Sequence, residues 1–120
     1  RPRRPAGATT NRRVMKEPWS LLVLLSRLST TAGATIAVEW HVFSDASDRA
    51  MTASVGDELV FSWAGNHNVY LMPDALSLNA CNFSGATELG SASAVSHTLG
   101  ALPAHFACAV GTHCSAGQRL

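Results

Sequence analysis

The sequence predicts an all-β fold, an antiparallel sandwich of short strands with one short helix. Three observations lead to this prediction. Short segments rich in β-branched and aromatic residues recur along the chain, and clusters of turn-forming residues separate them. Residues 58–63 alternate apolar and polar side chains, as a half-buried strand does. The length of 120 residues allows one domain, and the sequence contains neither an internal repeat nor heptads.

The expected strands follow one another from residue 35 onward, each bounded by a turn. In the third of them, Leu59, Phe61 and Trp63 share one apolar face. The alternation in the fifth is weak. The expected strands are residues 35–43, 51–55, 58–63, 67–72, 94–99 and 105–108.

One short helix is expected within residues 73–80, which open with a Pro-Asp pair. Its side chains Ala75, Leu76 and Leu78 would cover the core. Residues 84–93 are rich in Gly, Ser and Ala, and we expect them to form a loop.

Residues 1–34 form a segment distinct from the predicted domain of residues 35–120. Residues 1–14 contain two prolines and lack apolar periodicity, so we expect disorder. From Met15 a basic start, a short apolar run and an Ala-Gly-Ala stretch predict a secretory signal peptide that is cleaved after Ala34. The apolar run is too short to span a bilayer. The alternatives are an Arg-rich organelle transit peptide and a short surface helix. If Met15 is the true start, residues 1–14 are upstream translated sequence.

Charge is divided unequally along the chain. Residues 1–34 contain seven basic residues against one acidic residue, a net charge of +6, whereas residues 35–120 contain two against seven, a net charge of −5. An acidic domain is unsuited to binding nucleic acid, because such binding requires cationic side chains that face the phosphates. It is compatible with a cationic redox partner.

The last fifteen residues place a thiol, an imidazole and an amide at a spacing of five, in Cys108, His113 and Gln118. A further imidazole, His67, lies far back in the sequence. A spacing of five matches neither a helix face nor a strand face, so we expect these side chains around a loop. Two imidazoles, one thiolate and a weak fourth ligand are the donors of a mononuclear blue-copper centre.

Zinc is the competing metal for cysteine and histidine ligands. Structural zinc prefers four strong ligands at close spacing, and the sequence has no Cys-x-x-Cys pair. It also lacks the His-x-His pairs of a multicopper oxidase. We treat His41, His97 and His105 as ordinary histidines, because they fit no ligand spacing.

The chain resembles the phytocyanins, the plant-type extracellular cupredoxins, and within them the stellacyanins. The resemblance covers residues 35–120, and its most specific block is the last one. Glutamine at the position of Gln118 distinguishes the stellacyanins, because other phytocyanins carry Met there. The matching segments are Val55-Gly56-Asp57-Glu-Leu-Val-Phe61, His67-Asn68-Val69, Ala80-Cys81-Asn82-Phe83 and Phe106 through Leu120.

The resemblance implies a cupredoxin-like Greek-key sandwich that binds one copper ion through His67, Cys108, His113 and Gln118. It also implies a disulfide between Cys81 and Cys114, which would leave Cys108 reduced as a ligand. From the residues alone, three thiols in a reducing compartment are the alternative. Asn68 is expected to hydrogen-bond to the thiolate loop and so to hold the ligands in place; capping of its own turn is the alternative.

The implied function is a secreted, monomeric electron carrier, not an enzyme, that cycles between Cu(II) and Cu(I) with a small-molecule or protein partner. The alternatives are an extracellular adhesion protein without functional copper, and copper storage. Asn82-Phe83-Ser84 matches the N-glycosylation pattern. Compared with the family pattern, we expect the chain to be truncated after Leu120, where a membrane-anchor signal would follow. We also expect the chain to fray near Gln118.

Overall fold

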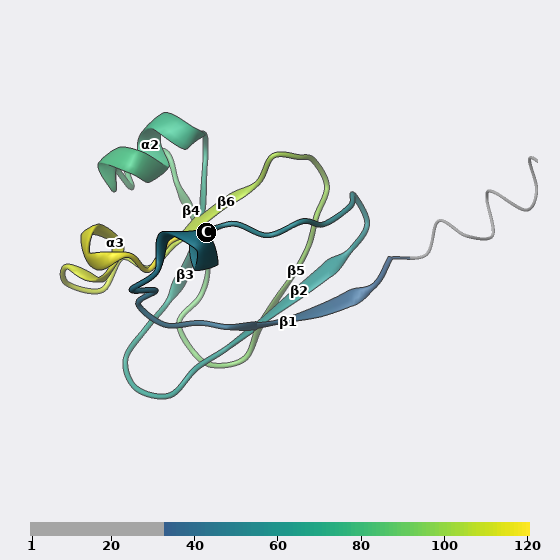
Figure 1. Cartoon of the computed structure of the whole chain (residues 1–120), viewed down its shortest axis with the longest axis horizontal. Helices are drawn as coiled ribbons and strands as arrows, with labels where there is room; N and C mark the ends of the chain where they lie inside the picture. The colour runs from purple at the N-terminus through teal and green to yellow at the C-terminus, as the bar shows by residue number, and fades with distance from the viewer. Residues whose placement is uncertain (1–32) are drawn as a thin grey trace, which may run out of the picture. The chain divides into compact units, whose positions relative to one another are not determined.

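The computed structural model describes residues 33–120, which contain six strands and three short helical segments (Figure 1). The predicted leader therefore lies outside the described residues, apart from its last two. The strands are β1 (Thr35–Glu39), β2 (Glu58–Ser62), β3 (Val69–Met72), β4 (Thr87–Gly90), β5 (Val95–Thr98) and β6 (His105–Ala107). The helical segments are η2 (Ala46–Arg49), α2 (Ala75–Ala80) and α3 (His113–Ala116).

The strands form two three-stranded sheets, which confirms the predicted all-β class. One sheet has the order β1-β2-β5 and the other the order β4-β3-β6. All pairs are antiparallel except β1 with β2, which run parallel with Thr35 opposite Glu58. The expected antiparallel pairing is therefore wrong at this one pair, where a long connection returns β2 alongside β1.

The core lies between the two sheets and is built from aromatic side chains. Phe61 of β2 and Phe106 of β6 are almost completely buried, with ring centroids 5.1 Å apart. Trp40, directly after β1, packs edge-on against Phe61 at 5.1 Å. As predicted, Leu59 and Phe61 occupy the apolar face of β2. This aromatic cluster packs β2 against β6, and the loops that follow these two strands contain His67 and Cys108.

Helix α2 forms where the Pro-Asp start predicted it. The Asp74 carboxylate accepts a hydrogen bond from the Ser77 N–H at 2.7 Å and so caps the first turn. The predicted core-facing role of Leu76 is wrong, because its side chain is 80% exposed. Only one face of so short a helix can contact the core, and Leu78 lies on that face.

Two segments differ from their expected structure. Residues 84–93 were expected to form a loop but contain β4, because pairing with β3 outweighs the low strand propensity of Gly, Ser and Ala. Residues 51–55 were expected to form a strand but do not pair with a neighbouring strand. Strand propensity alone does not supply the partner that a β-ladder requires.

The start of the described chain is fixed to the sheet by Ala34 and Asp57. The Asp57 carboxylate accepts hydrogen bonds from the N–H groups of Ala34 at 2.9 Å and Ser54 at 2.8 Å, and these bonds lower the pKa of the carboxyl. The carbonyl of Ala34 accepts a further bond from the Glu58 N–H. Across residues 33–120, the helices are too short to cross a bilayer.

Candidate metal centre

Two loops bring the predicted ligands together at one end of the sandwich. His67 lies in the turn between β2 and β3, Cys108 directly follows β6, and His113 begins α3. Gly111 and Gly117 take positive φ values of 50° and 124°, and they let the last loop turn tightly. A Cβ at Gly117 would also collide with the carbonyl oxygen of Phe43. The repeated spacing of five therefore does correspond to a loop, with one helical turn inside it.

The donor atoms of the two histidines and the cysteine face one another. The Cys108 Sγ lies 3.5 Å from the Nδ1 of His113 and 3.9 Å from the Nδ1 of His67, and the two Nδ1 atoms are 3.2 Å apart. Within residues 33–120, these three side chains are the one group of its kind with all donor atoms within 4.8 Å of one another.

These separations fit three ligands of one metal ion. Nitrogen and sulfur ligands bind zinc-sized ions at roughly 2.0–2.3 Å, which places donors around a shared ion roughly 3–4 Å apart. Two neutral ring nitrogens can share a hydrogen bond only if one of them carries the proton. A cation between the rings would accept both lone pairs together with one from the Cys108 sulfur, which a single hydrogen bond between the rings cannot do.

The surroundings of His67 favour the neutral form of its ring. Removal from water lowers the pKa of His67, and the neighbouring rings of His113 and His41 lower it further. The amide of Gln118 acts in the opposite direction. A neutral imidazole has the free lone pair that a metal ligand needs.

Gln118 is fully buried although its amide is polar. Its exposed fraction is 0%, and neither Oε1 nor Nε2 has a hydrogen-bond partner. Although the amide influences the His67 ring, the two side chains do not reach hydrogen-bond geometry. An unpaired buried amide costs roughly 1–3 kcal/mol, so its position calls for a partner that the protein atoms do not supply.

The expected fraying near Gln118 does not occur. The Gln118 N–H donates to the His113 carbonyl at 2.9 Å, and its carbonyl accepts from the Cys108 N–H at 3.1 Å. Leu120 pairs with Phe106 through two further backbone bonds. Backbone pairing therefore fixes the main chain of Gln118 beside Cys108 and His113.

Asn68 joins the two ligand loops, as the resemblance implies. Its side-chain oxygen accepts a 2.7 Å hydrogen bond from the N–H of Ala109, the residue after Cys108. Its backbone carbonyl accepts a 2.8 Å bond from the indole N–H of Trp40. Sequence reasoning missed Trp40, because nothing in the sequence shows that its indole faces the His67 loop.

The disulfide implied by the resemblance is present. Cys81 and Cys114 are joined, and Cys108 is the free cysteine of the described chain. Because Cys114 follows His113 directly, the disulfide ties the ligand loop to the C-terminal end of α2. The other histidines lie outside the donor cluster: His41 packs on Phe43, and the rest lie on β5 and β6.

Known proteins are similar to this chain in sequence and in fold. Cucumber peeling cupredoxin (Cucumis sativus) is 44% identical over 72 residues, which are 58% of this chain and 53% of that protein, so the match spans about half of this curated relative. The solved structure of cucumber stellacyanin with Cu²⁺ matches with a TM-score of 0.63 and 36% identity, over 73% of this chain and 92% of that one. The chain belongs to the phytocyanin family.

A second solved structure agrees with the phytocyanin assignment at the level of the fold. Spinach plantacyanin matches with a TM-score of 0.60 and 24% identity, over 72% of this chain and 94% of that one. Both likenesses confirm the predicted cupredoxin-like sandwich. No family model matches the chain.

Proposed function

We propose that this phytocyanin carries single electrons through one copper ion held by His67, Cys108 and His113, with Gln118 as a fourth, weaker ligand. The observation that carries the proposal is the convergence of one sulfur and two ring nitrogens to within 3.2–3.9 Å. When bound, copper would supply reversible one-electron exchange between Cu(II) and Cu(I). Cucumber stellacyanin, whose solved structure is named for Cu²⁺, supports this choice of metal.

The donor set favours copper over harder cations. A thiolate is a soft ligand, and two imidazoles with one thiolate suit a trigonal copper site. The buried Cys108 and half-buried His67 and His113 keep bulk water from most of the site. Gln118 would offer its amide oxygen, which is a harder donor than a thioether and lowers the reduction potential relative to a Met ligand.

The protein holds the ligands in one arrangement, so little has to move when an electron arrives or leaves. The Asn68 bond to Ala109 fixes the His67 loop to the Cys108 loop. The disulfide fixes the residue after His113. The partly exposed ring of His113 then gives the electron a route to the surface, since the thiol of Cys108 is fully buried.

We place the protein outside the cytoplasm, with secretion directed by the leader. A disulfide between Cys81 and Cys114 supports this placement, because structural disulfides persist mainly in oxidising compartments. Asn82 is exposed and its side-chain oxygen accepts bonds from the N–H and hydroxyl of Ser84, which leaves the amide nitrogen free for a glycan. The protein acts as a monomeric carrier rather than an enzyme, and its partner is a redox molecule, not a nucleic acid.

Voltammetry of the copper-loaded protein tests the proposal. The expected result is one reversible wave that corresponds to one electron per chain. Cys108→Ser is the matched control, because it removes the soft donor and nearly preserves side-chain volume; the wave should disappear or become irreversible. A copper-loaded native protein without a reversible wave would favour copper storage or a protein without functional copper.

A further inference from the structure

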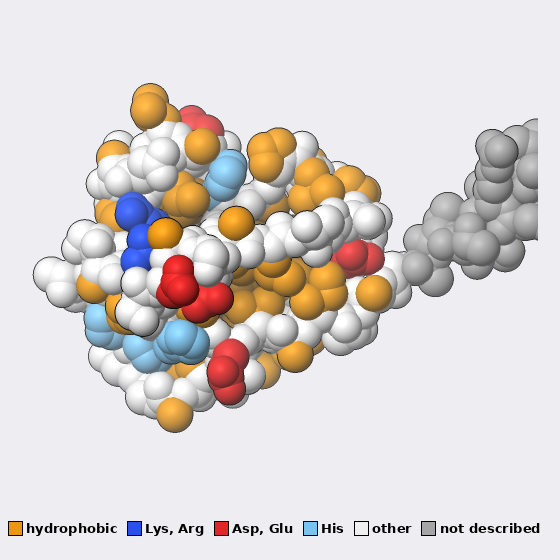
Figure 2. All heavy atoms as spheres, in the orientation of Figure 1, with side chains coloured by type: hydrophobic (Ala, Val, Ile, Leu, Met, Phe, Trp, Pro, Cys, Tyr) orange, Lys and Arg blue, Asp and Glu red, His pale blue; other side chains and the backbone are white. Residues whose placement is uncertain are grey.

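Arg49 and Arg119 are the basic residues of the described chain, residues 33–120. Figure 2 shows basic side chains grouped at one place on the molecule, beside acidic and histidine side chains. The two arginines bond different segments. Arg119 donates to the carbonyl of Asn79 in α2 at 3.3 Å, whereas Arg49 donates to the carbonyl of Phe43. Arg49 therefore acts on the connection between β1 and β2 (residues 40–57), and Arg119 acts on α2.

The β1–β2 connection turns back on itself at η2, which brings Arg49 against Phe43. The Asp45 carboxylate accepts hydrogen bonds from the N–H and the hydroxyl of Ser47, both at 3.0 Å, and so caps η2. At the end of η2 the half-buried Arg49 donates to the Phe43 carbonyl oxygen from Nε at 3.1 Å and from Nη2 at 2.7 Å. Two charge-assisted bonds from one planar group fix the direction of this carbonyl.

The Phe43 carbonyl and the Arg49 guanidinium both lie against Gly117 of the ligand loop (residues 108–118). A Cβ on Gly117 would collide with that carbonyl oxygen and would lie 2.7 Å from Nη2 of Arg49. The absence of a Cβ permits this approach, and the φ of 124° at Gly117 also favours glycine. Gln118, the proposed fourth ligand, is the next residue. These contacts therefore act on the backbone that carries its amide.

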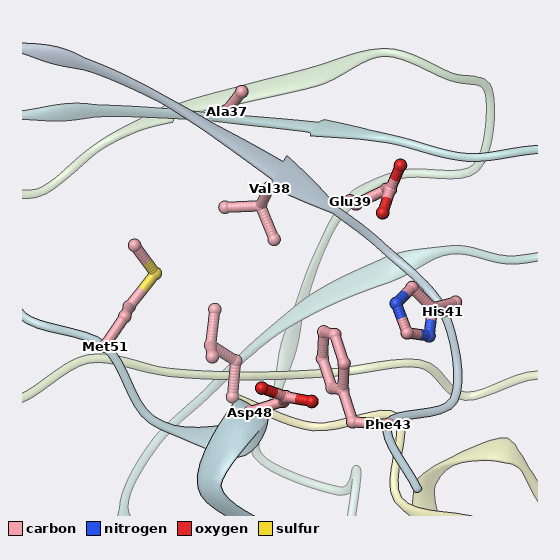
Figure 3. Close-up of a pocket in the computed structure, with 8 residues that line it drawn as sticks. Ala37, Val38, Glu39, His41, Phe43, Asp48 and Met51 are labelled. Carbon is pink, nitrogen blue, oxygen red and sulfur yellow. The ribbon is translucent and has the colours of Figure 1, made fainter. Parts of the chain in front are cut away.

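The same connection also contacts the loop that contains His67. The ring of Phe43 points toward Val38 (Figure 3) and packs edge-on against Trp40, with ring centroids 5.9 Å apart. The indole N–H of Trp40 donates to the Asn68 carbonyl. One short connection therefore contacts both ligand loops, through Trp40 on one side and through Phe43 on the other.

We propose that Arg49 is a positioning residue for the copper site. Its guanidinium holds the Phe43 carbonyl against Gly117 and so fixes the backbone from which Gln118 would ligate the metal. A weak axial ligand gains little from its bond to the metal, so the protein has to set its position. This inference deepens the proposed function and rests on it.

Amide hydrogen exchange of the metal-free protein tests the positioning itself. Arg49→Met removes both donors and keeps a long side chain, and Arg119→Met is the matched control because it removes the same charge. Exchange at the Gln118 N–H, which is hydrogen-bonded in the ligand loop, should become roughly tenfold faster or more in Arg49→Met and should not change in Arg119→Met. The hydrogen-bonded Leu99 N–H, which follows β5 in the other sheet, should keep its rate in both variants.

Three results of the exchange experiment would overturn the proposal. An unchanged rate at Gln118 in Arg49→Met would show that the ligand loop is held without the guanidinium. An equal increase at Leu99 would show that Arg49 stabilises the whole domain instead of one loop. Equal increases at Gln118 in Arg49→Met and Arg119→Met would show that the lost charge matters and the contact with Gly117 does not.

Voltammetry of the copper-loaded protein gives a second readout, which a purely structural role would not change. Arg49→Lys keeps the positive charge but loses the planar pair of donors, and Arg119→Lys is its control. The reduction potential should shift upward in Arg49→Lys, because a loosened Gln118 amide would donate less to the metal, and it should not shift in Arg119→Lys. Equal potentials in the native protein and in Arg49→Lys would overturn the proposal. Absence of a reversible wave from the native protein would refute the proposed function instead, whatever the exchange rates, so the two failures are distinguishable.

Discussion

Replacement of Gln118 by Met should stabilise the metal-free protein, which is unusual for a change at a fully buried position. The amide of Gln118 has no exposed surface, and both of its polar atoms are unpaired. Methionine has a similar shape and no strong hydrogen-bonding group. The substitution therefore removes the cost of burying an unpaired amide without opening a cavity.

The size of this effect follows from the burial of the amide. Burying an amide without partners costs roughly 1–3 kcal/mol, so the free energy of unfolding of the metal-free protein should rise by about that amount. For a domain of this size the thermal midpoint rises by roughly 4–8 °C per kcal/mol. In the copper-loaded protein the proposed ligation would give the amide the metal as a partner, so the gain should be smaller and the reduction potential should rise.

Thermal unfolding, followed by circular dichroism with and without copper, measures both effects. Asn79→Met is the control, because Asn79 is exposed and its replacement should change the midpoint little. A Gln118→Met protein that is less stable than the native protein without metal would refute the reasoning, since the amide would then have a partner that the fold supplies. An unchanged potential would count against axial ligation.

Three further predictions concern the scaffold. Cys81→Ser removes a disulfide whose cysteines are 33 residues apart. In the chain-entropy model this should lower the free energy of unfolding, measured by urea titration, by roughly 3–4 kcal/mol. A loss under about 1 kcal/mol would contradict the prediction. Asp57 has a lowered pKa, so its contribution to the free energy of unfolding is complete above the ordinary pKa of 3.8 and is lost as pH falls through the folded value. Asp57→Asn should therefore flatten the acid side of the plot of unfolding free energy against pH. An unchanged slope would argue against this. Trp40→Phe removes the indole bond to Asn68 and should cost roughly 1–3 kcal/mol and change the spectrum of the copper form, whereas a purely structural role would leave that spectrum unchanged.

The elements that sequence predicts well are those whose pattern is local. The alternation of Leu59 and Phe61 defines the face that β2 buries. The donor types at Cys108 and His113 predict a metal centre because they occur within one short loop. The contribution of His67 came from the family resemblance, since the sequence alone does not show which distant histidine returns to that loop.

The features that sequence reasoning missed depend on distant partners. β4 forms within a segment of low strand propensity because β3 lies beside it. Residues 51–55 have the composition of a strand but lack a neighbouring strand. The burial of Gln118 depends on the pairing of Leu120 with Phe106. In each case the deciding interaction joins residues that are distant in sequence, so no local pattern carries it.

Visible absorption during titration with Cu(II) tests the central claim most directly. The claim is that the sulfur of Cys108 and the ring nitrogens of His67 and His113 hold one copper ion. An intense thiolate-to-copper band should grow until one equivalent is bound and should be absent from the Cys108→Ser protein. A native protein that binds copper without this band, or a blue Cys108→Ser protein, would contradict the account.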